Sequence, residues 1–203
     1  MVESGIFYST LLDPLLQSLR RSVAAHINQG DRIIDIACGT GAQLFELADW
    51  AGSLTGVDLS ESMIRYAIKA AQKRKVPNAG FYVGDATDLS GFYGQRFDVA
   101  ILSLALHQFD PGLRGAVLSE IQKVADRIVV LDYAVPLPRN YMGVASRVAE
   151  FMAGRNHNGN FRSYTEAGGL MSILPENGFL IQNIETVGKG AFQVVVAQRS
   201  ADN

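Results

Sequence analysis

A short glycine-rich stretch of the sequence, DIACGTG at residues 35–41, has the composition of a ligand-binding turn. It lies between the apolar run RII and the segment AQLFELADW, whose spacing of apolar residues predicts a helix. The small Ala37 and the glycines Gly39 and Gly41 allow a tight strand-to-helix turn with exposed backbone amides, because glycine adopts positive φ values without steric cost. The start of a helix adds unpaired N–H groups and the positive end of a dipole. The stretch therefore predicts a site for a carboxylate, a phosphate or a nucleotide.

Two acidic residues at the ends of later apolar runs add to this turn. Asp58 follows SLTGV, and Asp85 follows GFYVG. An acidic side chain at the tip of the second strand of a nucleotide-binding sheet accepts hydrogen bonds from ribose hydroxyls. The dinucleotide fingerprint would need glycine or alanine where Leu44 stands, so the pattern favours a ribose and not a dinucleotide diphosphate. Asp85 would then lie near a base edge.

Short apolar runs alternate with amphipathic segments through the first two thirds of the chain. We expect strands at RIIDI, SLTGVD, GFYVGD, RFDVAILS and DRIVVLDY, and helices at AQLFELADW, ESMIRYAIKAAQKRK and GLRGAVLSEIQKV. This alternation predicts a parallel sheet with right-handed crossovers. Open sheets of this kind bind ligands at the carboxyl ends of their strands, where the turn and both acidic residues would lie.

The two ends of the chain depart from this alternation. Residues 1–29 contain a helical lead-in that starts near Asp13 and Pro14, with leucines on one side and Arg20 and Arg21 on the other. Residues 135–164 are rich in proline, glycine and asparagine around a short helical middle, and we interpret them as an inserted cap. A last helix ending at Gly178 and a hairpin joined by GKG complete the prediction, which makes residues 1–203 a single domain.

Composition excludes several classes of protein. The 203 residues carry a net charge of −2 with scattered Lys and Arg, so we expect no nucleic-acid partner. Cys38 is the single cysteine, which excludes an internal disulfide or a multi-cysteine metal site and fits a reducing compartment. We find no apolar stretch of membrane-spanning length and no signal-peptide pattern at the start, so the expected location is the cytoplasm.

These motifs together resemble class I S-adenosylmethionine-dependent methyltransferases of the small-molecule type, in particular the ubiquinone and menaquinone biosynthesis group. DIACGTG resembles the first motif of that family, VDLSESMIRYA its ribose loop, GDATDL its adenine loop and FDVAILSLALHQF its fourth strand. The match covers residues 30–135. It implies an α/β, Rossmann-like, doubly wound, seven-stranded and mostly parallel sheet with an antiparallel C-terminal hairpin and helices on both faces. It also implies methyl transfer from S-adenosylmethionine to a small-molecule acceptor, with S-adenosylhomocysteine as product.

The resemblance also implies roles for individual residues. Asp58 would bind the ribose diol, Met63 would pack on adenine, and Asp85 with Ala86 would address the adenine edge. Asp35 would orient the loop or the cofactor's amino group through water. The full set of expected cofactor-binding residues is Tyr8, Asp35, Ala37, Cys38, Gly39, Gly41, Asp58, Leu59, Met63, Gly84, Asp85, Ala86 and Ser103.

Three of these positions need separate comment. Gly39 and Gly41 would run beside the methionine part of the cofactor. Cys38 stands where the family commonly has glycine, which should narrow the turn without abolishing it, and we assign the thiol no chemistry because no His or Asn adjoins it in sequence. Tyr8 matches a position from which related enzymes close over the cofactor carboxylate.

Two histidines are the candidates for catalysis. Methyl transfer from a sulfonium is an in-line displacement, so placing the acceptor can supply most of the acceleration. A hydroxyl, ammonium or carbon-acid acceptor must also lose a proton, for which histidine is a natural base. His107 follows the predicted fourth strand and His157 lies in the cap, where a solvated loop histidine is the alternative; His26 is expected at the surface of the lead-in helix.

Missing motifs restrict the substrate. No Asn-Pro-Pro-aromatic pattern follows the fourth strand, which disfavours methylation of nucleic-acid bases, and the acidic residues of metal-assisted catechol-type enzymes are absent, so we expect no metal. Phe151, Met152, Phe161 and Tyr164 would line an apolar or aromatic acceptor pocket or form a small core of the cap. Two alternatives remain: a protein that binds the cofactor or its product without turnover, and a NAD-dependent oxidoreductase, which Leu44 and the lack of a Tyr-x-x-x-Lys pair disfavour.

Overall fold

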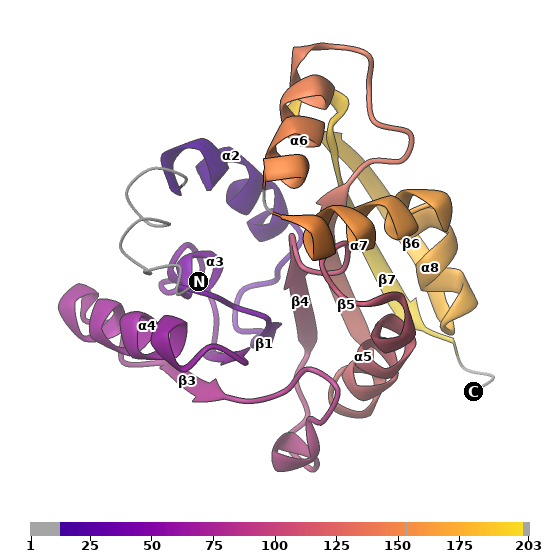
Figure 1. Ribbon diagram of the computed structural model, residues 1–203. Helices are drawn as coiled ribbons and strands as arrows, with labels where there is room; N and C mark the ends of the chain where they lie inside the picture. The colour runs from indigo at the N-terminus through magenta and orange to yellow at the C-terminus, as the bar shows by residue number, and fades with distance from the viewer. Residues whose placement is uncertain (1–12, 153, 201–203) are drawn as a thin grey trace.

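The computed structural model describes residues 13–152 and 154–200, which form one seven-stranded sheet flanked by helices (Figure 1). The order of strands is β3-β2-β1-β4-β5-β7-β6. The first five strands are parallel, and β7 runs antiparallel to both β5 and β6. The strands are β1 Arg32–Ile36, β2 Ser53–Asp58, β3 Ala79–Val83, β4 Val99–Ser103, β5 Arg127–Tyr133, β6 Phe179–Val187 and β7 Phe192–Arg199. The expected fold class, including the antiparallel hairpin, is confirmed.

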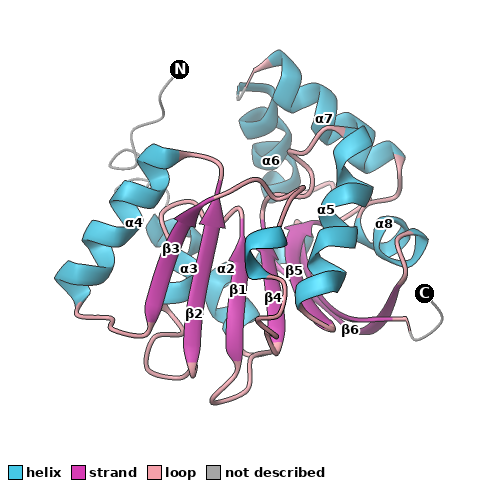
Figure 2. Cartoon of the chain, turned by 90° about the horizontal axis from the view of Figure 1, so that it is seen from below, coloured by secondary structure: helices cyan, strands magenta, loops and turns pink. Residues whose placement is uncertain are grey.

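Helices cover both faces of this sheet, with α2 and α3 behind the strands and α5 in front of them in Figure 2. The central strands β1, β4 and β5 are buried almost throughout, which explains why their sequences are continuous apolar runs. The helices are α2 Asp13–Ala24, α3 Ala42–Phe45, α4 Glu61–Arg74, α5 Pro111–Val124, α6 Tyr141–Met152, α7 Arg155–Glu166 and α8 Leu170–Glu176, with short 3-10 turns η1 Ser90–Phe92 and η2 Gly188–Gly190. None of the helices in residues 13–152 and 154–200 has the length and apolar character needed to span a membrane.

Local sequence signals explain where the two long crossover helices begin. The side chain of Ser60 caps α4 by accepting a hydrogen bond from the backbone N–H of Met63. Asp110 caps α5 in the same way through Gly112, and Pro111 occupies the first turn, where its missing N–H costs nothing. Both helices therefore begin directly after strand-to-helix loops at the carboxyl edge of the sheet.

Helix boundaries differ from the expectation at three places. The helix expected over AQLFELADW shortens to α3 Ala42–Phe45 and continues as turns, in which the indole N–H of Trp50 donates to the carbonyl of Ile27. The cap contains two helices, α6 and α7, where we expected a short helical middle. The last helix, α8, ends at Glu176 and not at Gly178, and Gly168 and Gly169, with φ values of 84° and 65°, separate it from α7.

Candidate active site

A cavity of about 620 Å³ opens at the carboxyl ends of β1, β2 and β4. Its size is that of a pocket for a drug-sized or nucleoside-sized ligand. The lead-in helix α2 closes one side of it, and the loop after β4 closes another. The lining residues are Leu16, Leu19, Arg20, Asp35, Ala37, Cys38, Gly39, Thr40, Ala42, Gln43, Asp58, Ser60, Ser62, Met63, Ser103, Leu104, Ala105, Gln108 and Leu131.

The turn after β1 has the left-handed backbone that its composition predicts. Ala37, Gly39 and Gly41 have φ values of 56°, 54° and 74°. A Cβ atom added at Gly39 would meet no atom within 4 Å, whereas one added at Gly41 would lie 2.6 Å from the ring of Phe81. Gly39 therefore borders open space in the cavity lining, and Gly41 is needed for close packing of the turn against β3.

Asp58 joins the turn to the start of α4. Its Oδ2 accepts a hydrogen bond of 2.8 Å from the backbone N–H of Gly39, and its Oδ1 accepts one of 2.8 Å from Ser60. A carboxylate offers about four lone-pair positions, so both oxygens retain capacity for further donors such as the hydroxyls of a ribose. Asp58 therefore shapes the loop and also presents acceptor capacity to the cavity that it lines.

Three buried polar atoms of cavity-lining residues have no hydrogen-bond partner within the described chain. They are Oδ1 of Asp35, Oε1 of Gln43 and Oγ of Ser103. Asp35 is 2% exposed, and its burial, together with the nearby charge of Asp58, raises the pKa of its carboxyl well above the usual value. An unsatisfied buried polar atom costs roughly 1–3 kcal/mol, so a ligand that carries an ammonium or hydroxyl group would recover that energy here.

The other expected cofactor residues divide into two groups. Met63, Ala37, Cys38 and Ser103 line the cavity together with the residues above. The carboxylate of Asp85 accepts from the backbone N–H and hydroxyl of Thr87, which lowers its pKa. The remaining expected residues, Gly41, Leu59, Gly84, Asp85 and Ala86, are not part of the lining, and Tyr8 lies outside the described residues.

Several lining residues were missed at the sequence level. Arg20 borders the cavity, although the apolar spacing of the lead-in helix assigned it to the side opposite the leucines. The amide of Gln43 donates to the carbonyl of Arg20 at 3.2 Å and so links α3 to α2. Leu104 and Gln108 belong to the loop after β4, in which Leu104 has a positive φ of 53°. Gln108 was detectable, since it directly follows the histidine that the sequence singled out.

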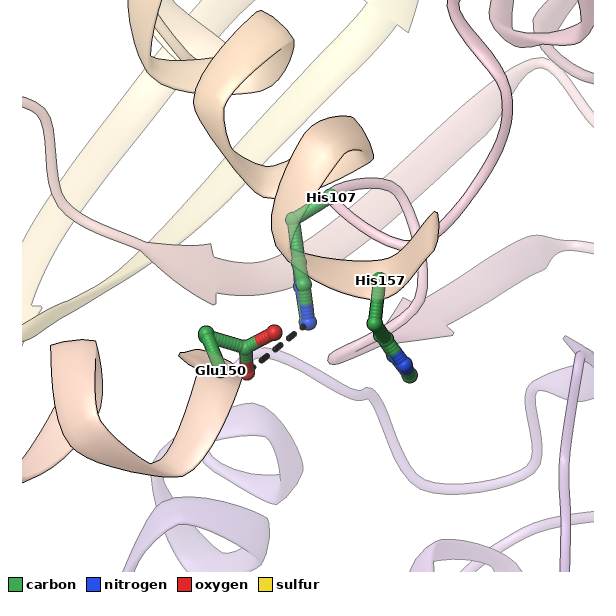
Figure 3. Close-up of side chains that lie close together, drawn as sticks. All are labelled: His107, Glu150 and His157. Carbon is green, nitrogen blue, oxygen red and sulfur yellow. Dashed lines mark ion pairs between the residues drawn. The ribbon is translucent and has the colours of Figure 1, made fainter. Parts of the chain in front are cut away.

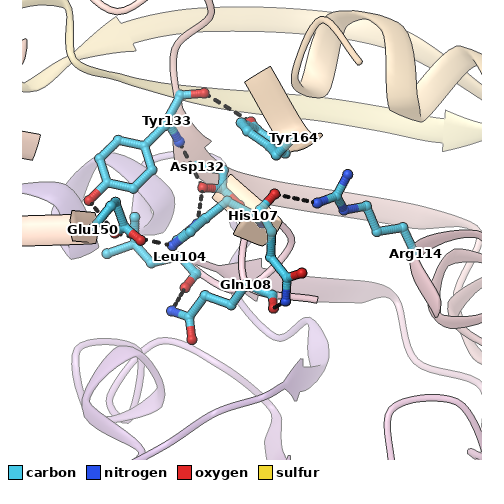
Figure 4. A network of polar contacts seen from close by, with 9 residues as sticks. Leu104, His107, Gln108, Arg114, Asp132, Tyr133, Glu150 and Tyr164 are labelled. Carbon is cyan, nitrogen blue, oxygen red and sulfur yellow. Dashed lines mark hydrogen bonds and ion pairs between the residues drawn. The ribbon is translucent and has the colours of Figure 1, made fainter. Parts of the chain in front are cut away.

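His107 is held in a buried network and is absent from the cavity lining (Figure 4). Its side chain is 2% exposed, its Nδ1 lies 2.5 Å from Oδ1 of Asp132, and its Nε2 lies 3.5 Å from Oε1 of Glu150. Burial alone would lower the pKa of His107, but the two carboxylates raise it to about 9. A raised pKa and a place outside the cavity lining make His107 a poor candidate for the general base that the sequence suggested, and that role stays a prediction.

Residues of the cap complete this network. The hydroxyl of Tyr133 donates to Glu150 at 2.9 Å, and the hydroxyl of Tyr164 donates to the carbonyl of Tyr133 at 2.9 Å. Phe161 and Tyr164 are buried, whereas Phe151 and Met152 are 72% and 79% exposed. The four apolar cap residues thus do not form one pocket; two belong to the core around His107 and two face outward.

The remaining histidines occupy different surroundings. The ring of His157 is half-buried, with its centroid 6.3 Å from that of His107. His26 pairs with Glu185 across 3.1 Å and is partly covered, so it is less exposed than we expected for a surface position. Neither residue is part of the cavity lining.

Comparison with known proteins places this geometry in context. A family model described as "Methyltransferase domain" matches residues 27–169. Demethylmenaquinone methyltransferase of Beutenbergia cavernae is 34% identical over 110 residues, covering 53% of this chain and 42% of the relative. Aklanonic acid methyltransferase DauC of Streptomyces sp. is 38% identical over 80 residues, covering 38% of this chain and 36% of the relative. The chain thus spans less than half the length of either relative.

A solved structure shows that the likeness extends to the whole fold. The PH0226 protein of Pyrococcus horikoshii superposes with a TM-score of 0.73 at 21% identity, covering 95% of this chain and 92% of the other. At that level of identity the comparison concerns the fold alone. The position of the cavity, at the carboxyl ends of the parallel strands, is the usual ligand position of such sheets.

Proposed function

Because this chain belongs to the methyltransferase-domain family, we propose that it transfers a methyl group from S-adenosylmethionine to a small-molecule acceptor. One structural observation supports this proposal in addition to the family membership. The cavity at the ends of β1, β2 and β4 combines the Asp58 carboxylate with buried polar atoms that lack a partner in the described chain. These atoms suit a ligand with both a diol and a charged amine.

The residues present fit the proposed cofactor. Asp58 would accept hydrogen bonds from the ribose hydroxyls, and Met63 would pack against the base. Asp35 and Ser103 would accept hydrogen bonds from the amino group of the methionine part, which would run past the open side of Gly39. When bound, S-adenosylmethionine supplies a methyl group on a sulfonium and leaves as S-adenosylhomocysteine.

Positioning of the acceptor is the catalytic contribution that we propose for the protein. Holding two reactants at a near-attack distance can supply several kcal/mol of the barrier in a displacement of this kind. The network around His107 fixes the loop whose residues Leu104 and Gln108 line the cavity. His107 would thus be a positioning residue, since its backbone N–H donates to Asp132 at 3.1 Å and its ring is buried outside the cavity lining.

The apolar residues of the cavity lining favour an apolar acceptor. Leu104, Ala105 and Leu131 line the cavity near the end of β4. The similarity to relatives named for demethylmenaquinone and aklanonic acid supports a small-molecule acceptor. We therefore propose an acceptor with a largely apolar body.

The test is acceptor-dependent formation of S-adenosylhomocysteine. The purified protein is incubated with S-adenosylmethionine and a panel of reduced naphthoquinones and hydroxylated polycyclic aromatics, and both products are quantified by mass spectrometry. We expect product with at least one acceptor and far less with Asp58→Ala. A protein that binds S-adenosylmethionine but yields product with no acceptor would support the alternative of binding without turnover.

A further inference from the structure

Three potential metal ligands from separate segments lie close together (Figure 3). His107 comes from the loop after β4, Glu150 from α6 and His157 from α7. Each residue offers one nitrogen or oxygen atom, and these three atoms all lie within 4.8 Å of one another. Nε2 of His107 lies 3.5 Å from Oε1 of Glu150, the separation of two donors that share one metal ion at about 2.0–2.2 Å each.

The ring of His107 is oriented as that of a metal ligand would be. Its Nδ1 lies 2.5 Å from Oδ1 of Asp132, so that Nε2 faces Glu150. Binding of a metal ion at Nε2 would release the proton that the carboxylates favour there in the metal-free protein. Metal-binding histidines commonly use the other ring nitrogen to bond a carboxylate, which fixes the tautomer and the ring orientation. Tyr133, Phe161 and Tyr164 pack edge-on around the imidazole and restrict its rotation further.

Glu150 supplies the independent sign that a ligand belongs here. Its side chain is 9% exposed, and Oε1 accepts the hydroxyl of Tyr133. The second oxygen, Oε2, is buried and finds no hydrogen-bond partner in residues 13–152 and 154–200. A buried carboxylate oxygen without a donor is costly, and a cation is one of the few groups that would satisfy it.

We propose that His107, Glu150 and His157 bind one divalent transition-metal ion, with Zn²⁺ the best match, and that Asp132 supports the site through His107. Two imidazole nitrogens and one carboxylate oxygen form a ligand set suited to Zn²⁺, whereas Mg²⁺ and Ca²⁺ prefer oxygen alone. A fourth position would remain for water or another oxygen ligand. This proposal departs from the expectation from sequence that the chain has no metal, which nothing in the structure tests.

The ion would link the cap to the sheet. It would join α6 and α7 to the loop after β4, and that loop contributes Leu104, Ala105 and Gln108 to the cavity lining. The proposal does not depend on the identity of the cofactor or acceptor, because it concerns binding of the metal alone.

The test uses the full chain, stripped of metal with a chelator and titrated with Co²⁺ and Zn²⁺. Visible absorption of Co²⁺ reports its ligands, and calorimetry with Zn²⁺ gives affinity and stoichiometry. We expect one ion per chain, and an affinity at least tenfold weaker in both His157→Ala and Glu150→Gln. Glu150→Gln keeps an oxygen for the Tyr133 hydroxyl, so its fold should be preserved, which circular dichroism of the metal-free protein checks.

His26→Ala is the matched control, because it removes the remaining histidine, which pairs with Glu185 on strand β6. This variant should bind both metals as the parent does. A parent chain that binds less than one ion, a His157→Ala or Glu150→Gln variant that binds as tightly as the parent, or a loss of binding in His26→Ala would each overturn the proposal. In those cases the cluster is an ion-paired network internal to the protein.

Discussion

Two buried polar regions at the carboxyl edge of the sheet differ in whether the protein itself supplies the hydrogen-bond partners of their polar atoms. In the cavity at β1, β2 and β4, buried oxygens of Asp35, Gln43 and Ser103 lack partners in the described chain. In the network around His107, Asp132 and Tyr133, nearly every polar atom is bonded by the protein itself. Both regions are buried, so burial alone does not identify a ligand site. The unsatisfied oxygens mark the cavity as the place for an organic ligand, whereas the unpartnered Oε2 of Glu150 belongs to the metal site proposed within the network.

The largest effect should follow from breaking the network. Asp132 is fully buried and bonds both the ring and the backbone N–H of His107. Asp132→Ala would leave a buried imidazole without its partner, and we expect the free energy of unfolding to fall by roughly 3–5 kcal/mol in urea titrations. The control Asp126→Ala removes an exposed carboxylate 3.9 Å from Arg96 and should change stability by less than about 0.5 kcal/mol. Similar small losses of unfolding free energy in both variants would contradict the view that Asp132 holds the network together.

The next effect concerns ligand affinity in the cavity. Asp58→Ala removes the carboxylate that would bind the ribose and that also bonds Gly39 and Ser60. Binding of S-adenosylhomocysteine, measured by calorimetry, should weaken by about 1.5–3 kcal/mol. Asp49→Ala, at an exposed position outside the lining, should bind as the parent does. An unchanged affinity in Asp58→Ala would show that the ribose has been placed wrongly.

A third comparison separates the two glycines of the turn. Both Gly39→Ala and Gly41→Ala place a side chain at positive φ, which costs roughly 1–2 kcal/mol. Gly41→Ala should lose a further 1–3 kcal/mol or so in stability, because its Cβ would lie 2.6 Å from Phe81, while that of Gly39 meets open space. Chemical denaturation of both variants measures the difference. Equal stabilities would mean that the ring of Phe81 can move away from the new Cβ atom without loss of stability.

The smallest effect should come from Ser103→Ala. The hydroxyl oxygen of Ser103 is buried without a partner in the described chain, so its removal should leave stability within about 0.5 kcal/mol of the parent. Affinity for S-adenosylhomocysteine should fall by about 0.5–1.5 kcal/mol if the hydroxyl bonds the ligand. A marked loss of stability with no loss of affinity would show that the Ser103 hydroxyl supports the fold and does not bind the ligand.

The strands and the opening turn were predictable because their signals are local. Continuous apolar runs located β1 to β5, and the glycine spacing located the turn that Asp58 braces. The network was not predictable, since Asp132 and Glu150 lie 25 and 43 positions beyond His107 in the sequence and meet it only through the fold. The end of α3 escaped prediction for a similar reason, because the indole of Trp50 bonds a carbonyl 23 residues earlier.

The two glycines of the turn show a further limit of prediction from sequence. Composition indicates that Gly39 and Gly41 both permit positive φ, and the structure confirms this for both. Their separate roles depend on Phe81, which belongs to another strand and is unconnected in sequence to the turn. The local conformation of the site was therefore accessible from sequence, whereas the division between ligand-facing and packing residues required the fold.

The most direct test of the cavity's role is a calorimetric titration of the ligand-stripped protein with S-adenosylhomocysteine, with NAD titrated in parallel. We predict binding of S-adenosylhomocysteine in the micromolar range or tighter and no binding of NAD. Binding of NAD alone, or of neither compound, would contradict the assignment of the cavity to S-adenosylmethionine.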